Sequence, residues 1–152
     1  MNKKIIAALV VTTFIATPSA DAVSLSAAQK SKLQYLIEEE KLARDVYTYL
    51  AKNVTSQKFS NIARSEQTHM DQIAAVMANY KVSNPTVGKA AGEFKNVALA
   101  NLYKKLTAQG AESVTAAFGV GVTIEKMDIS DLVKIRKIFS QADVLSVLDL
   151  LN

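Results

Sequence analysis

Residues 33–50 read LQYLIEEEKLARDVYTYL, and this stretch decides the fold. Its apolar residues recur at alternating spacings of three and four, the period of one face of an α-helix. The interior positions in this count are Leu33, Leu36, Glu40, Ala43, Tyr47 and Leu50. The stretch therefore predicts a helix that carries one carboxylate, that of Glu40, towards the protein core.

Two further segments repeat this anomaly. In residues 59–80 the same count places Glu66 and His69 in the middle of an apolar face. In residues 114–139 it places Glu125 and Asp128 at the centre of a face that is apolar at both ends. The first of these faces comprises Phe59, Ile62, Glu66, His69, Ile73, Val76 and Tyr80. The second comprises Val114, Phe118, Gly121, Glu125, Asp128, Leu132, Ile135 and Phe139.

The remaining sequence has the same helical period, so we predict an all-α protein. Ser26 and Gln29 have the spacing of a capping box at the start of the first helix. A short turn at residues 53–56 implies that the first two helices pack antiparallel. The predicted helices span about residues 26–52, 57–80, 97–109, 112–139 and 140–152.

Residues 1–22 have the form of a secretory signal peptide. Lys3 and Lys4 precede an apolar run over residues 5–16, and the small-residue pattern Ala20-Asp21-Ala22 follows. The run is too short to cross a hydrocarbon core, which needs about 20 residues. We therefore expect export to a bacterial periplasm or the extracellular space, no stable membrane insertion, and one domain over residues 23–152.

Composition excludes several function classes. The sequence has 152 residues, 49% of them hydrophobic, and no cysteine, which excludes disulfides, a cysteine nucleophile, iron-sulfur clusters and cysteine-based zinc sites. Basic residues are interspersed with acidic and apolar ones, so nucleic acid is not an expected partner. No glycine-rich phosphate-binding motif is present, so no organic nucleotide cofactor is expected.

Carboxylates that point into the core need an opposite charge or a proton nearby, because removing one from water costs several kcal/mol unless it is paired or coordinated. Lysine is absent from the centres of the three faces, so a bound metal ion is the simplest way to neutralise these carboxylates. Residues at i and i+3 project from the same side of a helix. Glu66 and His69 can therefore offer an oxygen and a nitrogen to one ion. The predicted metal ligands are Glu40, Glu66, His69, Glu125 and Asp128.

Other interpretations of these residues stay open. The pair Glu66 and His69 is also typical of a simple hydrogen-bonded pair. Asp128 suits ligation and helix capping about equally, since residues 127–131 resemble a helix start. Glu38 and Glu39 extend Glu40 into a charge run, which usually marks a solvated face, so we expect both on the surface. Tyr47 and Tyr80 are interpreted as core packing.

These segments together resemble a ferritin-like family of prokaryotic proteins, the domain of unknown function 2202, over about residues 30–152. The matching stretches are EEEKLARDVY at 38–47, SEQTH at 65–69, LY at 102–103 and IEKMDISDL at 124–132. The first is also similar to the first ligand helix of rubrerythrins. The resemblance implies a ferritin-like antiparallel helical bundle. One half of its metal site would be Glu40, Glu66 and His69, and the other half Glu125 and Asp128.

Members of that family usually continue beyond the final helix into a segment with an Asn-His pair, whereas this sequence stops at Asn152. The second histidine is therefore missing, and a mononuclear or carboxylate-rich site becomes an alternative to a pair of ions. Mixed carboxylate and imidazole ligands suit iron or manganese, although affinity alone would permit zinc or copper.

Our leading hypothesis is an exported di-iron or di-manganese protein that oxidises Fe(II) or removes peroxide, with dioxygen or peroxide as partners. The second hypothesis is a non-catalytic protein that binds or buffers metal. The third is a metal-free helical interaction module. The sequence leaves the oligomeric state open.

Overall fold

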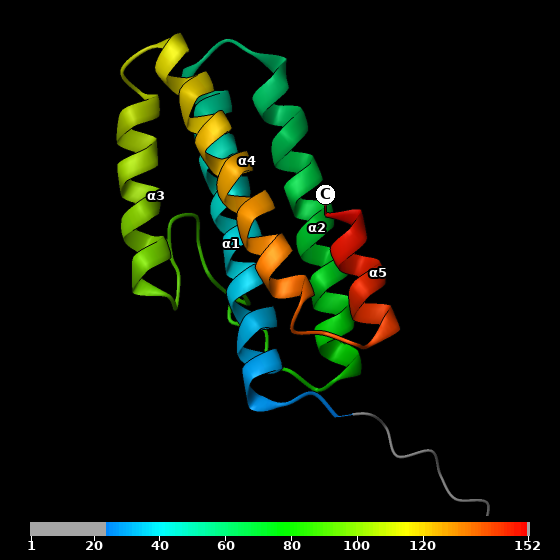
Figure 1. Cartoon of the computed structure of the whole chain (residues 1–152). Coiled ribbons are helices and arrows are strands. Elements are labelled where there is room, and N and C mark those ends of the chain that lie inside the picture. Colours follow the sequence, from blue (N-terminus) through cyan, green and yellow to red (C-terminus); the bar gives the residue numbers. More distant parts are fainter. Residues whose placement is uncertain (1–23, 152) are drawn as a thin grey trace, which may run out of the picture.

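The computed structural model describes residues 24–151, so the predicted signal peptide lies outside the described residues. The described chain forms five helices and no strand, which confirms the all-α prediction (Figure 1). The helices are α1 (Ala27–Asn53), α2 (Gln57–Asn79), α3 (Val97–Gly110), α4 (Val114–Arg136) and α5 (Ala142–Leu150). None of them is both long enough and apolar enough to span a bilayer.

Side-chain caps explain where several helices begin. Ser26 accepts a hydrogen bond from the Gln29 backbone, and the Gln29 side chain accepts one from the Ser26 backbone, so the predicted capping box is present. Ser113 caps α4 by accepting from the Ala116 backbone. Helix α4 thus begins at Val114, and Asp128 lies in its interior. The alternative that Asp128 caps a helix is therefore wrong.

Helix α1 lies at the centre of the bundle. It packs against α2, α3 and α4, and α5 packs against α2 and α4. Figure 1 shows α2 and α4 running opposite to α1, so the predicted antiparallel packing of the first two helices is confirmed. The backbones of α2 and α4 do not approach each other closely, although the rings of Phe59 and Phe118 meet between them. One side of the bundle is therefore open between them.

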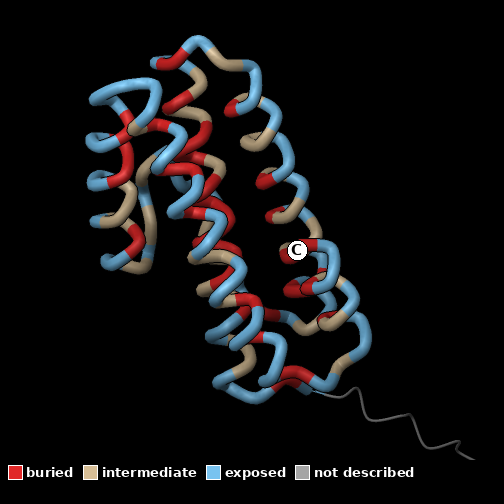
Figure 2. Tube along the Cα trace, turned by 45° about the horizontal axis from the view of Figure 1, so that its top comes forward, coloured by how far each residue is buried: buried red, intermediate tan, exposed pale blue. Residues whose placement is uncertain are grey.

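Two hydrophobic clusters make up the core, and the path of α1 connects them. The first surrounds the early part of α1 and includes Leu36, Ile73 and Leu132. The second surrounds its later part and includes Val46 and Phe59. Between them α1 buries four charged residues in succession, at positions 38–41, while solvent-exposed residues lie mainly on the outer surfaces of the helices (Figure 2). We call residues 38–41 the polar belt.

Part of this belt is held by the loop between α2 and α3. The Lys41 ammonium lies 2.5 Å from Asp45 Oδ2, donates to the Ala90 carbonyl, and lies over the Phe94 ring. Asp45 also accepts from the Gly92 backbone and from Arg44. Both members of the Lys41–Asp45 pair are buried. The pair therefore fastens the loop to α1.

Replacing Asp45 by Leu leaves the buried Lys41 ammonium without its carboxylate. We expect Asp45→Leu to lower the free energy of unfolding by about 3–5 kcal/mol. Lys134→Met breaks the exposed Lys134–Asp131 pair and should cost less than about 1 kcal/mol. Urea denaturation of the two variants measures the difference. Equal losses would contradict the assigned role of Asp45.

Candidate metal centre

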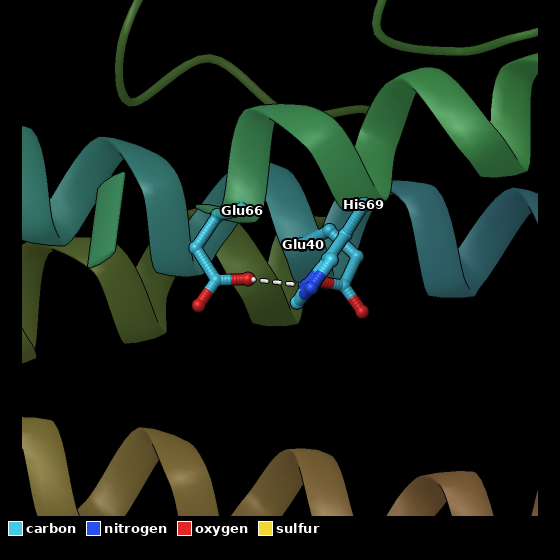
Figure 3. A group of neighbouring side chains, drawn as sticks. All are labelled: Glu40, Glu66 and His69. Atoms are coloured by element: carbon cyan, nitrogen blue, oxygen red, sulfur yellow. Dashed lines mark hydrogen bonds and ion pairs between the residues drawn. The ribbon is translucent and has the colours of Figure 1, made fainter. Parts of the chain in front are cut away.

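Three of the predicted ligands converge where α1 faces α2. The His69 Nδ1 atom lies 3.2 Å from Glu40 Oε2 and 3.1 Å from Glu66 Oε2 (Figure 3). One ligand atom from each residue lies within 4.8 Å of the other two. Both carboxylates are buried, whereas His69 is partly exposed. The predicted proximity of Glu40, Glu66 and His69 is therefore confirmed.

Glu125 and Asp128 approach this group from α4. Together with Glu40, Glu66 and His69 they line one enclosed cavity of about 100 Å³, which Ile129 and Leu151 complete. The close three-residue group includes neither α4 acid. All five predicted residues thus share a cavity, but the α4 pair lies farther from the other three.

The two α4 acids differ in their surroundings. Glu125 is largely exposed, contrary to its predicted inward position, although its Oε1 atom accepts from the Tyr47 hydroxyl at 2.6 Å. Asp128 is half-buried, and its Oδ1 atom is buried without a hydrogen-bond partner. A missing partner for a buried acceptor usually costs about 1–3 kcal/mol. Of the two α4 acids, Asp128 is therefore the one that needs a ligand or a proton.

Burial and mutual repulsion control the protonation of the centre. Burial, followed by the nearby carboxylates, raises the pKa of Asp128 to about 9. Burial also raises the pKa of Glu40, although the His69 hydrogen bond opposes this rise. Hydrogen bonds that the imidazolium donates to Glu40 and Glu66 raise the pKa of His69 to about 10. In the absence of metal the chain therefore holds protons where an ion would bind.

Tyr47 contributes more than the core packing assigned to it from sequence. Its ring packs beside Phe59, and its hydroxyl reaches across to the Glu125 carboxylate. The same hydroxyl lies 3.3 Å from the Gly121 carbonyl oxygen, which is a second acceptor on α4. Tyr47 thereby links α1 to the α4 side of the centre.

Glu39 is a buried acid that faces Asp128 and Asp131 of α4, so its predicted surface position is wrong. It is 1% exposed, and its Oε1 atom lies 3.3 Å from the Tyr35 hydroxyl, which also lies 3.2 Å from Asp131 Oδ2. Burial, followed by the charge of Asp131, raises the pKa of Glu39 to about 8. Its Oε2 atom is buried without a partner. Apolar residues on both sides of the charge run were the available sequence signal for burial.

Glu38 is also buried, contrary to the prediction. Its Oε1 atom accepts from the backbone N–H groups of Lys95 and Asn96, which immediately precede α3. The carboxylate thus satisfies donors at the end of a long loop. This contact joins residues 57 and 58 positions apart, so helical period along α1 carries no information about it.

A scan against family models matches residues 29–152 to the uncharacterized protein domain DUF2202. The chain belongs to the DUF2202 family. One relative is the uncharacterized protein MJ0754 of Methanocaldococcus jannaschii, which is 44% identical over 110 residues. That alignment covers 72% of this chain but 60% of the relative, so the chain matches less than two thirds of that protein's length.

A solved structure has a fold similar to that of this chain. The crystal structure of hypothetical protein MJ0754 from Methanococcus jannaschii DSM 2661 has a TM-score of 0.81 to this chain at 40% sequence identity. The match covers 86% of this chain and 75% of the other. The helical arrangement that brings the candidate ligands together is therefore similar to that of an experimentally determined structure.

The single histidine of this DUF2202 chain gives a direct test of the centre's electrostatics. The pKa of His69 is raised in the folded state, so the charged imidazole stabilises the fold below about pH 6.5. This contribution is lost as pH rises through about 10. In chelator-treated protein, proton NMR should show the imidazole still charged at pH 8. The double variant Glu40→Gln/Glu66→Gln should return the midpoint towards its ordinary value, and an unchanged midpoint would refute the proposed contacts.

Proposed function

We propose that this exported DUF2202 protein is a ferritin-like bundle that binds iron or manganese at Glu40, Glu66 and His69. Glu125 and Asp128 would hold a second ion beside the first. The proposal rests on one observation above all, the convergence of three ligand atoms within 4.8 Å in a largely buried setting. One glutamate from a helix and a Glu-x-x-His pair from its neighbour are typical of paired-metal carboxylate bundles.

The charge balance supports a cation at this position. Glu40, Glu66, Glu125 and Asp128 line the 100 Å³ cavity with His69 as the one basic residue in its lining. The nearby Arg44 and Lys41 pair with Asp45 instead. The unpartnered Asp128 oxygen supplies a further acceptor. Oxygen-rich ligands with one imidazole fit iron or manganese better than a site for copper or structural zinc.

Bound iron or manganese would supply redox chemistry towards dioxygen or peroxide, with Fe(II) as a candidate substrate. The residues of the chain prepare the site for that chemistry. The hydrogen bond from Tyr47 orients Glu125. His69 and Asp128 would release their protons when a cation binds, because a metal ligand must be deprotonated. The partly exposed His69 provides the side from which an ion enters.

The composition of the α4 pair favours a second candidate function, non-catalytic metal buffering. The sequence places Asp128 where a second Glu-x-x-His motif would have histidine, and His69 is the one histidine of the chain. The α4 half-site would then hold its ion weakly and release it readily.

Metal binding is tested by dialysing the purified protein against Fe(II) under anaerobic conditions, or against Mn(II), and measuring metal content. We expect one or two ions per chain and a higher melting temperature than with chelator, because the ion binds the folded state. Glu66→Gln should abolish both effects. Glu93→Gln, which changes an exposed glutamate outside the centre, should change neither. If the wild-type chain takes up no metal, and its melting temperature is the same with metal as with chelator, the remaining hypothesis is a metal-free interaction module.

Catalysis requires a separate measurement. We expect the iron-loaded protein to consume dioxygen or peroxide while Fe(II) is oxidised. Tyr47→Phe should slow this at least about tenfold while retaining the ion at Glu40, Glu66 and His69, because the Tyr47 hydroxyl orients the Glu125 carboxylate and an orienting ligand partner commonly contributes about 10–100-fold. Oxygen-electrode traces and metal analysis on the same samples distinguish the two effects. Full metal occupancy without turnover would establish buffering as the function.

A further inference from the structure

Helix α4 carries apolar residues on its outer surface as well as on the surface it buries. Five large apolar side chains, which we call the outer α4 face, are 40–58% exposed. These residues are Val114, Phe118, Val122, Ile129 and Val133. A helix that is apolar all round is normally covered on every side, and contiguous exposed apolar residues mark an interaction surface.

The outer α4 face borders the open side of the bundle. Phe118, Val122 and Ile129 line a cavity of about 800 Å³ between α2 and α4, whose backbones do not come close to each other. Phe59 and Ile62 of α2 also line it, and the Phe59 ring packs against the ring of Phe118 with their centroids 4.9 Å apart, so the two helices touch at this point. The cavity also reaches Glu66, His69 and Glu125. Whatever covers this face therefore also covers the candidate metal centre.

The spacing along the face is the same in both directions. Counting Glu125 with the five apolar residues, the steps are four, four, three, four and four. In an isologous antiparallel helix pair, each residue contacts its mirror position on the other copy. Val114 then faces Val133 of a second copy, Phe118 faces Ile129, and Val122 faces Glu125. The Glu125 carboxylate accepts from the Tyr47 hydroxyl of its own chain, so that it has a polar partner beneath the interface. A face with this symmetry matches itself when the second helix is reversed.

Charge supports the antiparallel direction. Glu112 immediately precedes the cap of α4, whereas Lys134 and Arg136 lie in its last turn. Antiparallel pairing places Glu112 of one copy beside Lys134 of the other, at both ends of the interface, in addition to the Lys134–Asp131 pair within each copy. Parallel pairing would instead place Lys134 beside its own counterpart, and juxtaposed like charges disfavour association.

We propose that two copies of this chain pair through the outer α4 face in antiparallel orientation, closing the cavity between α2 and α4 over the metal centre. The partner helix replaces bulk water along Phe118, Val122 and Ile129. It also restricts the path by which solvent and small molecules reach Glu66 and Glu125. Pairing of this kind is a property beyond metal binding, and it does not depend on a bound ion.

Cross-linking tests the orientation, because the chain has no cysteine of its own. Full-length Val114→Cys and Val133→Cys are mixed and oxidised in the presence of chelator. We expect a disulfide-linked dimer from the mixture and little from either variant alone. A mixture of Val97→Cys, from the exposed surface of α3, with Val133→Cys is the matched control. Efficient cross-linking of Val114→Cys with itself, or no preference over the control, would overturn the proposal.

Sedimentation equilibrium of the full-length chain tests the association itself. Val133→Glu should weaken the dimer about tenfold or more, equivalent to about 1.4 kcal/mol. Adding Val114→Lys should restore association, because the introduced ammonium of each copy then faces the introduced carboxylate of the other. Val97→Glu should have no effect, and circular dichroism checks that every variant folds. A monomeric wild-type chain, or a double variant weaker than Val133→Glu, would refute the dimer. Because chelator is present throughout, a failed metal-binding test leaves these outcomes interpretable.

Discussion

The structure depends on the cost of burying charge in the middle of α1. The polar belt lies between two hydrophobic clusters, so its groups are removed from water by the same packing that stabilises the fold. Each fully buried aliphatic side chain contributes about 1.5–3 kcal/mol, whereas each buried ion costs several. The clusters can hold the belt in place only if most of its charges find partners.

The belt finds those partners unequally on its different sides. Towards the loop between α2 and α3, Glu38 accepts two backbone hydrogen bonds and Lys41 pairs with Asp45. Towards α2 and α4, Glu40 meets further carboxylates and one histidine. The first side is satisfied by the chain itself and serves stability. The second side retains an excess of acids, which is why the candidate centre lies there.

Helical period predicted the half of the centre that lies on α1 and α2, because those helices pack along their length and their facing positions follow a simple count. It misplaced Glu38 and Glu39, since the rule for charge runs assumes a solvent-facing side and α1 is covered by three helices. It also predicted Val114 and Phe118 to be inside. Both are exposed, although the Phe118 ring still packs on Phe59 of α2. The backbones of α2 and α4 stay apart, a tertiary arrangement that no single helix encodes. The role of Tyr47 depends on the same inter-helix geometry.

The short connection between α1 and α2 gives the centre an assembly order. Glu40, Glu66 and His69 belong to one helical hairpin whose contacts span 29 residues or fewer, and contacts of low sequence separation form early in folding. The hydroxyl of Tyr47 finds Glu125 only across 78 residues, after α3 and most of α4 exist. By this criterion the part of the candidate centre on α1 and α2 forms before the carboxylates of α4 reach the shared cavity.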